Sequence, residues 1–85
     1  MLWRTELPED VEAADVVARM LTAGWVASNP NSFVHTIQDP HGHILVIVPR
    51  TRRVQIRLDF ETPKPTRALT ARAIHRTLMQ FCLAG

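Results

Sequence analysis

The segment Arg53-Val54-Gln55-Ile56-Arg57-Leu58-Asp59-Phe60 alternates strictly between polar and apolar side chains. This period of two is typical of a β-strand that buries one face and exposes the other to water. The apolar side chains at the even-numbered positions are therefore expected to face the core. The polar side chains at the odd-numbered positions are expected to face outward.

Two further strands are predicted before this one. Residues 43–48 form a continuous β-branched and apolar run, typical of a central strand, and residues 33–38 form the strand that precedes it. The turn Asp39-Pro40-His41-Gly42 between them has aspartate, proline and glycine where a type I turn prefers them. Residues 25–28 are a candidate for an additional short strand. Because the connections are short, we expect an antiparallel meander.

Helices are predicted on both sides of the strands. Over residues 8–23 apolar side chains recur at helical spacing, and Gly24 ends the segment. A second apolar stripe covers residues 67–83, after a proline-containing break at 61–66. This order predicts one α+β domain over residues 1–85, a two-layer sandwich with a three- or four-stranded antiparallel sheet and two helices on one face. The expected core residues are Val11, Ala14, Leu21, Val46, Val54, Ile56, Leu58, Ile74 and Leu78.

Composition limits the class of protein. A chain of 85 residues with 46% hydrophobic and 21% charged residues is an ordinary globular domain rather than a disordered segment. The single cysteine, Cys82, excludes an internal disulfide, favours a reducing compartment and is expected to be a small buried hydrophobe. The longest apolar run, Ile44–Pro49, is too short to span a bilayer. We therefore expect a cytoplasmic protein without membrane association.

Charge is distributed unevenly along the chain. Five of the eight acidic residues lie within the first 15 positions, where Asp15 is also spaced to pair with Arg19. Eight of the ten basic residues lie between Arg50 and Arg76, opposed there only by Asp59 and Glu61. Guanidinium groups bind phosphate in a bidentate geometry, which makes this region a candidate nucleic-acid-binding surface. Its expected residues are Arg50, Arg52, Arg53, Arg57, Arg72 and Arg76.

No aromatic residue lies among these arginines, so recognition of a duplex or structured RNA fits better than base stacking on a single strand. The alternative is a solvated charged face. Basic residues on an edge strand also deter aggregation, which explains Arg53 and Arg57 without a ligand.

The histidines are candidates for other chemistry. His35 lies mid-strand and could be a general acid or base on an open face, or a structural histidine on a core face. No nucleophile or paired carboxylate is placed to complete a catalytic set with it. His41 and His43 are candidate metal ligands, with turn polarity as the alternative. We predict no cofactor.

Parts of the chain resemble the HicA-type messenger-RNA interferase toxins. The resemblance covers Leu21–Trp25, the turn at 39–42 with the strand that ends at Pro49, and the closing segment 69–85. The order helix, strands, helix is also similar to the double-stranded-RNA-binding domain. Both resemblances imply an RNA ligand, and the first implies cleavage by a histidine after Gly-Ser. Here Asn31-Ser32-Phe33 places a phenylalanine at that position, and residues 53–60 are an insertion.

Three functions follow as hypotheses. The first is a small non-catalytic module that binds nucleic acid through its arginines. The second is a protein-interaction module, or a regulatory subunit, that self-associates as a homodimer through complementary charged poles. The third is a HicA-like ribonuclease that uses His35.

Overall fold

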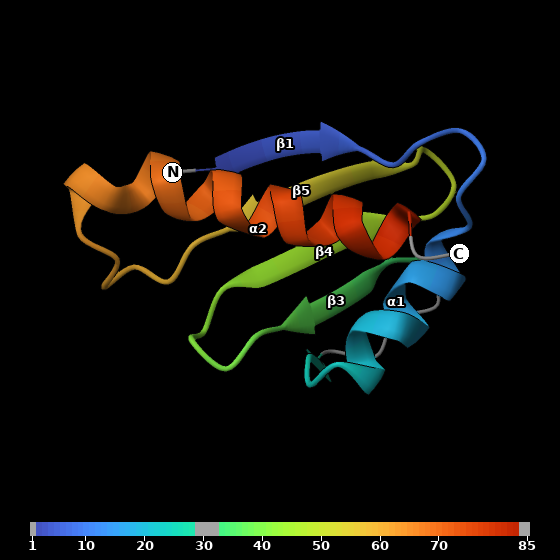
Figure 1. The fold of residues 1–85 in the computed structure, drawn as a ribbon, viewed down its shortest axis with the longest axis horizontal. Helices are drawn as coiled ribbons and strands as arrows, with labels where there is room; N and C mark the ends of the chain where they lie inside the picture. The colour runs from blue at the N-terminus through green and yellow to red at the C-terminus, as the bar shows by residue number, and fades with distance from the viewer. Residues whose placement is uncertain (1, 29–32, 84–85) are drawn as a thin grey trace.

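An antiparallel sheet of five strands carries the fold (Figure 1). The computed structural model describes residues 2–28 and 33–83. The strands are β1 (Leu2–Glu6), β2 (Val26–Ala27), β3 (His35–Gln38), β4 (Ile44–Val48) and β5 (Arg53–Arg57). The helices are α1 (Ala13–Thr22) and α2 (Arg67–Leu83), and a short 3-10 turn, η1 (Lys64–Thr66), precedes α2. The strand order is β1-β5-β4-β3-β2.

β1 is the element that was not predicted. It pairs antiparallel with β5, with Leu2 opposite Arg57 and Glu6 opposite Arg53. The element order is therefore β-α-β-β-β-β-α, and the sheet has five strands rather than three or four. A segment of five residues gives too little alternation to be recognised by itself, and its partner lies near the other end of the chain. Without β1, the strand β5 would be an open sheet edge.

The central meander agrees with the prediction, with shorter elements. β3 pairs with β4 and β4 pairs with β5, both antiparallel, and the candidate strand at 25–28 is the two-residue β2. β5 ends at Arg57 instead of continuing to Phe60. Beyond Arg57 the chain leaves the sheet, and the expectation that Phe60 faces the core is wrong, because its side chain is 83% exposed.

The first helix begins later and is rotated relative to the prediction. It starts at Ala13 rather than at residue 8. Its buried side chains are Ala13, Val16, Val17 and Met20. Ala14 and Leu21, which were expected in the core, are exposed. The observed rotation buries Val16, Val17 and Met20 in place of Ala14 and Leu21, which removes more apolar area from water.

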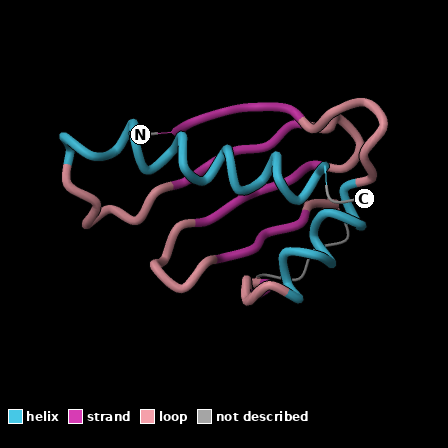
Figure 2. The backbone as a smooth tube through the Cα atoms, viewed as in Figure 1, coloured by secondary structure: helices cyan, strands magenta, loops and turns pink. Residues whose placement is uncertain are grey.

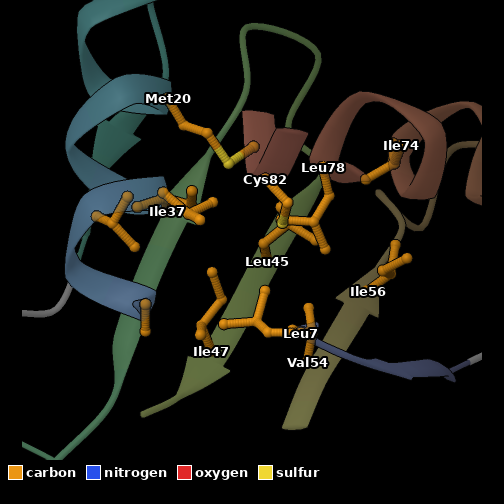
Figure 3. Close-up of a cluster of buried hydrophobic side chains, with 13 residues drawn as sticks. Leu7, Met20, Ile37, Leu45, Ile47, Val54, Ile56, Ile74, Leu78 and Cys82 are labelled. Carbon is orange, nitrogen blue, oxygen red and sulfur yellow. The ribbon is translucent and has the colours of Figure 1, made fainter. Parts of the chain in front are cut away.

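The core lies between one face of the sheet and the two helices (Figures 2 and 3). The register places alternate residues of β3, β4 and β5 on this face, and α2 packs against β5 while α1 packs against β3. Val54, Ile56, Ile74 and Leu78 are confirmed as buried, and Val11 and Leu58 pack against the core while remaining partly exposed. The sheet contributes Ile37, Leu45, Ile47, Val54 and Ile56; the helices contribute Met20, Ile74, Leu78 and Cys82 among others.

The opposite face of the sheet is not covered by α1 or α2. Val46 lies on this face, because it is opposite Thr36 on β3 and Gln55 on β5, and it is only half-buried. The prediction of Val46 as a core residue is therefore wrong. A continuous apolar strand gives no alternation from which its inward side could be chosen.

Candidate nucleic-acid interface

The arginines of β5 lie on the uncovered face of the sheet. Arg53 and Arg57 alternate with the buried Val54 and Ile56, so both side chains point away from the helices. Arg4 of β1 shares their face, because it is directly opposite Gln55. Arg4, Arg53 and Arg57 are all exposed. The strong alternation of the β5 sequence predicted this outward orientation correctly.

The arginines of α2 belong to the other layer. Arg72 and Arg76 are exposed, whereas Ala71, Ile74 and Leu78 of the same helix are buried against the sheet. The strand arginines and the helix arginines therefore lie on opposite sides of the sheet. The single platform that the sequence predicts for all six arginines is not formed.

Arg72 nevertheless reaches the edge strand of the sheet. It lines a cleft of about 120 Å³ between β1 and α2, which we call the edge cleft. Across this cleft the Thr5 hydroxyl and His75 Nε2 form a hydrogen bond of 3.2 Å. The edge cleft is lined by Trp3, Arg4, Thr5, Ile56, Ala71, Arg72 and His75.

Arg4 connects the two layers. It lines the edge cleft with Arg72 and His75, and it also lines a second cleft of about 480 Å³ with Arg53. This second cleft, the face cleft, lies over β1 and β5 and is also lined by Thr5, Glu6, Val54 and Gln55. Basic side chains thus continue from the open face around the β1 edge to α2. We call Arg53, Arg4, Arg72 and His75 the basic band.

Arg4 was missed in the sequence because it lies far from the cluster of basic residues at 50–76. The local sequence gave no signal, because Leu2 and Trp3 are both apolar while Arg4, Thr5 and Glu6 are all polar, so the segment does not alternate.

Arg52 has a structural position that its sequence context did not reveal. Its guanidinium donates hydrogen bonds to the carbonyl oxygens of Pro8 and Val11, and its own carbonyl accepts one from the Leu7 amide at 2.8 Å. Arg52 has a positive φ of 63°, in the left-handed region that favours glycine. The side chain is half-buried and holds the connection between β1 and α1 against the turn before β5. It is not part of the basic band.

The remaining predicted arginines lie outside the two clefts. Arg50 is exposed in the turn between β4 and β5, and Arg57 lies at the end of β5. Arg76 is exposed one helical turn beyond Arg72. Arg53 and Arg72 are therefore the two predicted residues that the clefts bring into one band, and Arg4 joins them.

The histidine candidates are separated from the band. His35 is half-buried on the core face, directly opposite Ile47, which is the placement expected of a structural histidine. In the turn before β4, Asp39 Oδ1 accepts hydrogen bonds from the amides of His41 and His43, at 3.0 and 2.8 Å. His43 Nδ1 accepts another from the Asp59 amide at 3.0 Å, so this ring nitrogen is occupied. Across residues 2–28 and 33–83, no group of three or more His, Cys, Asp or Glu side chains could hold a metal ion.

Charge differs between the two edges of the sheet. From Lys64 to Leu83 the sequence contains four basic residues and no acidic one. The acidic segment, formed by Glu9, Asp10, Glu12 and Asp15, is exposed and lies in and before α1, which packs on β3 near the opposite edge. Glu6 lines the face cleft beside Arg53 and reduces the positive charge there. The edge cleft has no acidic side chain among its described lining residues.

Cys82 is chemically separate from the basic band. Burial raises the pKa of its thiol, and this effect outweighs the opposing influence of the Arg19 and Arg52 guanidiniums. The thiol is therefore protonated near neutral pH, which is the unreactive form. Cys82 is a buried core side chain, as the sequence predicted.

No family model, curated protein or solved structure matches this chain. In the two described ranges, neither helix is long and apolar enough to cross a membrane. The chemistry of the basic band is therefore the main guide to function.

Proposed function

We propose that this protein is a small non-catalytic module that binds the phosphate backbone of nucleic acid through the basic band. The observation that carries the proposal is the position of Arg4, which lines both the face cleft and the edge cleft. Arg4 thereby extends a surface from Arg53 on β5 to Arg72 on α2. Three guanidiniums along one path provide bidentate donors for successive phosphate groups.

The surroundings of the band favour recognition of the backbone over recognition of bases. The most exposed aromatic side chains, Phe33 and Phe60, are 79% and 83% exposed and do not line either cleft. Trp3 forms part of the wall of the edge cleft and is half-buried. Stacking of successive bases needs exposed rings beside the cations, so a duplex or structured RNA is the better ligand.

The resemblance to RNA-directed families supports RNA as the ligand. Phe33 stands where the HicA-type toxins carry their catalytic histidine. His35, the nearest alternative on the same strand, lies on the core face of the sheet. These two positions favour binding without cleavage.

Salt dependence of RNA binding tests the proposal. Fluorescence anisotropy with a labelled RNA duplex of about 16 base pairs, the span of a typical double-stranded-RNA-binding domain, gives the affinity between 50 and 300 mM salt, about the range used for such tests. With three arginine contacts, the slope of log K against log salt should be about −3. Arg4→Gln, Arg53→Gln and Arg72→Gln should each reduce the slope by about one.

Arg50→Gln is the matched control, because it removes the same charge from an exposed turn outside both clefts. Its slope should stay within half a unit, roughly, of the wild type. A flat salt dependence, or an equal loss in the Arg50 variant, would contradict binding at the basic band.

Self-association is a second candidate function, favoured by the separation of charge across the sheet. The acidic segment leads into α1, which packs on β3 next to the β2 edge, and the basic band lies at the β1 edge. Contact between the two in neighbouring copies would pair opposite charges. Sedimentation without nucleic acid should then show a dimer that dissociates as salt is added, and a monomer at all salt concentrations would exclude this function.

A further inference from the structure

We propose that the edge cleft is a subsite for a terminal phosphate monoester, so that the protein prefers nucleic acid with a phosphorylated end. This inference deepens the proposed function and rests on it for the identity of the molecule that carries the phosphate. It concerns the small cleft between β1 and α2, whose polar wall is formed by Arg4, Thr5, Arg72 and His75.

The size of the edge cleft selects a small ligand group. Sites for small organic ligands usually have volumes of about 300–1,000 Å³. The edge cleft has about 120 Å³, whereas the neighbouring face cleft has about 480 Å³. A nucleoside does not fit into the smaller space, but a single tetrahedral oxyanion does.

The donors of the edge cleft match a phosphate monoester. Arg72 supplies guanidinium donors and Thr5 adds a hydroxyl, while Arg4 of the edge strand also lines the cleft. The hydrogen bond of 3.2 Å between Thr5 Oγ1 and His75 Nε2 holds the imidazole beside that hydroxyl. A monoester carries a charge of about −1.5 to −2 and three terminal oxygens at neutral pH. An internal phosphodiester has a single charge and two such oxygens, and it would leave part of this donor set unused.

The floor of the edge cleft is apolar. Ile56 and Ala71 line it and are each only 2% exposed, whereas Arg72 and His75 are exposed. The small side chain of Ala71 also keeps the helix from filling the space next to Arg72.

Trp3 gives the cleft a built-in reporter. It lines the edge cleft, and its indole nitrogen is buried without a hydrogen-bond partner in the described part of the chain. The other tryptophan, Trp25, precedes β2 and is not a lining residue. A change in tryptophan fluorescence on addition of phosphate that is kept in Trp25→Phe therefore reports on Trp3.

The decisive experiment compares RNA duplexes that differ only in their ends. Labelled duplexes with 5′-phosphate, 3′-phosphate or hydroxyl ends are titrated into the wild-type protein. A phosphorylated end should tighten binding about tenfold, and inorganic phosphate should compete for this gain and change the Trp3 fluorescence. Equal affinity for phosphorylated and hydroxyl ends would overturn the subsite.

Arg72→Gln and Arg76→Gln form the matched pair of variants. Both arginines are exposed on α2 one helical turn apart, but only Arg72 lines the edge cleft. Arg72→Gln should abolish the preference for a phosphorylated end, and Arg76→Gln should keep it. Equal effects of the two variants would contradict the assignment, and unchanged thermal unfolding of both verifies that they are folded.

The outcomes separate the two proposals. Salt-dependent binding through Arg4 and Arg53 without any preference for the end would overturn the subsite and leave the proposed function in place. Binding of inorganic phosphate that depends on Arg72, together with no binding of any RNA, would support the phosphate subsite and overturn nucleic acid as its carrier.

Discussion

The guanidinium of Arg19 on α1 donates a hydrogen bond to the carbonyl oxygen of Phe81 on α2, with a length of 2.9 Å. Phe81 lies in the last turn of α2, where carbonyl groups have no partner within the helix. Arg19 therefore satisfies one of these carbonyls and also places a positive charge at the negative end of the helix dipole. This contact takes the place of the expected ion pair between Arg19 and Asp15.

Replacement of Arg19 should remove the hydrogen bond between α1 and α2 and thereby destabilise the protein. Arg19→Met keeps much of the aliphatic stem but removes the donor, and it should lower the free energy of unfolding by about 1.5–3 kcal/mol. Urea denaturation measures this loss. Arg50→Met, in an exposed turn, should change stability by no more than about 0.5 kcal/mol. Equal stabilities of the two variants would show that the bond to Phe81 contributes nothing.

Arg52 combines a side-chain role and a backbone role that two variants can separate. Both Arg52→Ala and Arg52→Gly lose the hydrogen bonds to Pro8 and Val11, so both should be less stable than the wild type. Glycine adopts the positive φ of this position without steric cost, whereas alanine does not. Arg52→Gly should therefore be more stable than Arg52→Ala by about 1 kcal/mol. The reverse order in thermal or urea unfolding would contradict the backbone role.

Met20 and Leu21 are adjacent in α1 but have opposite environments. Met20 is 0% exposed and Leu21 is 38% exposed. Met20→Ala should cost about 2–5 kcal/mol of unfolding free energy, because it leaves a cavity between α1 and the sheet. Leu21→Ala should cost less than about 1 kcal/mol. If Leu21→Ala lost more unfolding free energy than Met20→Ala, the sequence-based prediction that Leu21 faces the core would be correct and the described orientation of α1 would be wrong.

The outcome for these two residues shows how far sequence patterning determines the fold. The position of a helix between residues 8 and 23 followed from its apolar spacing, but two overlapping stripes were available within it. Which of the two stripes faces the core depends on which side chains fill the space over Ile37 and Leu45. That space exists only in the assembled core. β5 was predictable because its alternation is strict, whereas β4 is apolar at every position and gave no direction for Val46.

The candidate site was less predictable than the fold. Strand alternation placed Arg53 outward, and helical spacing placed Arg72 on an exposed face. Neither pattern contains the information that α2 covers the face opposite Arg53. Arg4 joins the band only because β1 pairs with β5, a contact between distant parts of the chain. Arg52 was wrongly predicted to belong to the nucleic-acid-binding surface. Its hydrogen-bond partners are backbone carbonyl groups, which the sequence does not identify.

The buried thiol of Cys82 predicts a dependence of stability on alkaline pH. Burial raises the pKa of this thiol in the folded protein, so the folded state holds the proton more tightly than the unfolded state. Its contribution to stability is complete below the pKa of the unfolded thiol and declines as pH rises through the higher pKa of the folded thiol. The decline should begin at about pH 8.5.

Cys82→Ala removes this titration and provides the comparison. The stability difference between wild type and variant, measured by urea unfolding between about pH 7 and 10, should narrow as pH rises. If the stability difference between wild type and Cys82→Ala stayed constant over that pH range, the Cys82 thiol would have the same pKa in the folded and unfolded protein. At neutral pH, where the buried thiol stays protonated, modification of the wild type by a thiol reagent under native conditions should be slow.

The pairing of β1 with β5 also has a consequence for the order of events during synthesis. β1 is synthesised well before its partner, which is completed only when Arg57 has been added. Until then the N-terminal segment has no strand to join, and closing so long a loop makes this contact intrinsically slow. Arg4 and Arg53 therefore become neighbours only after the whole segment from β1 through β5 has been synthesised.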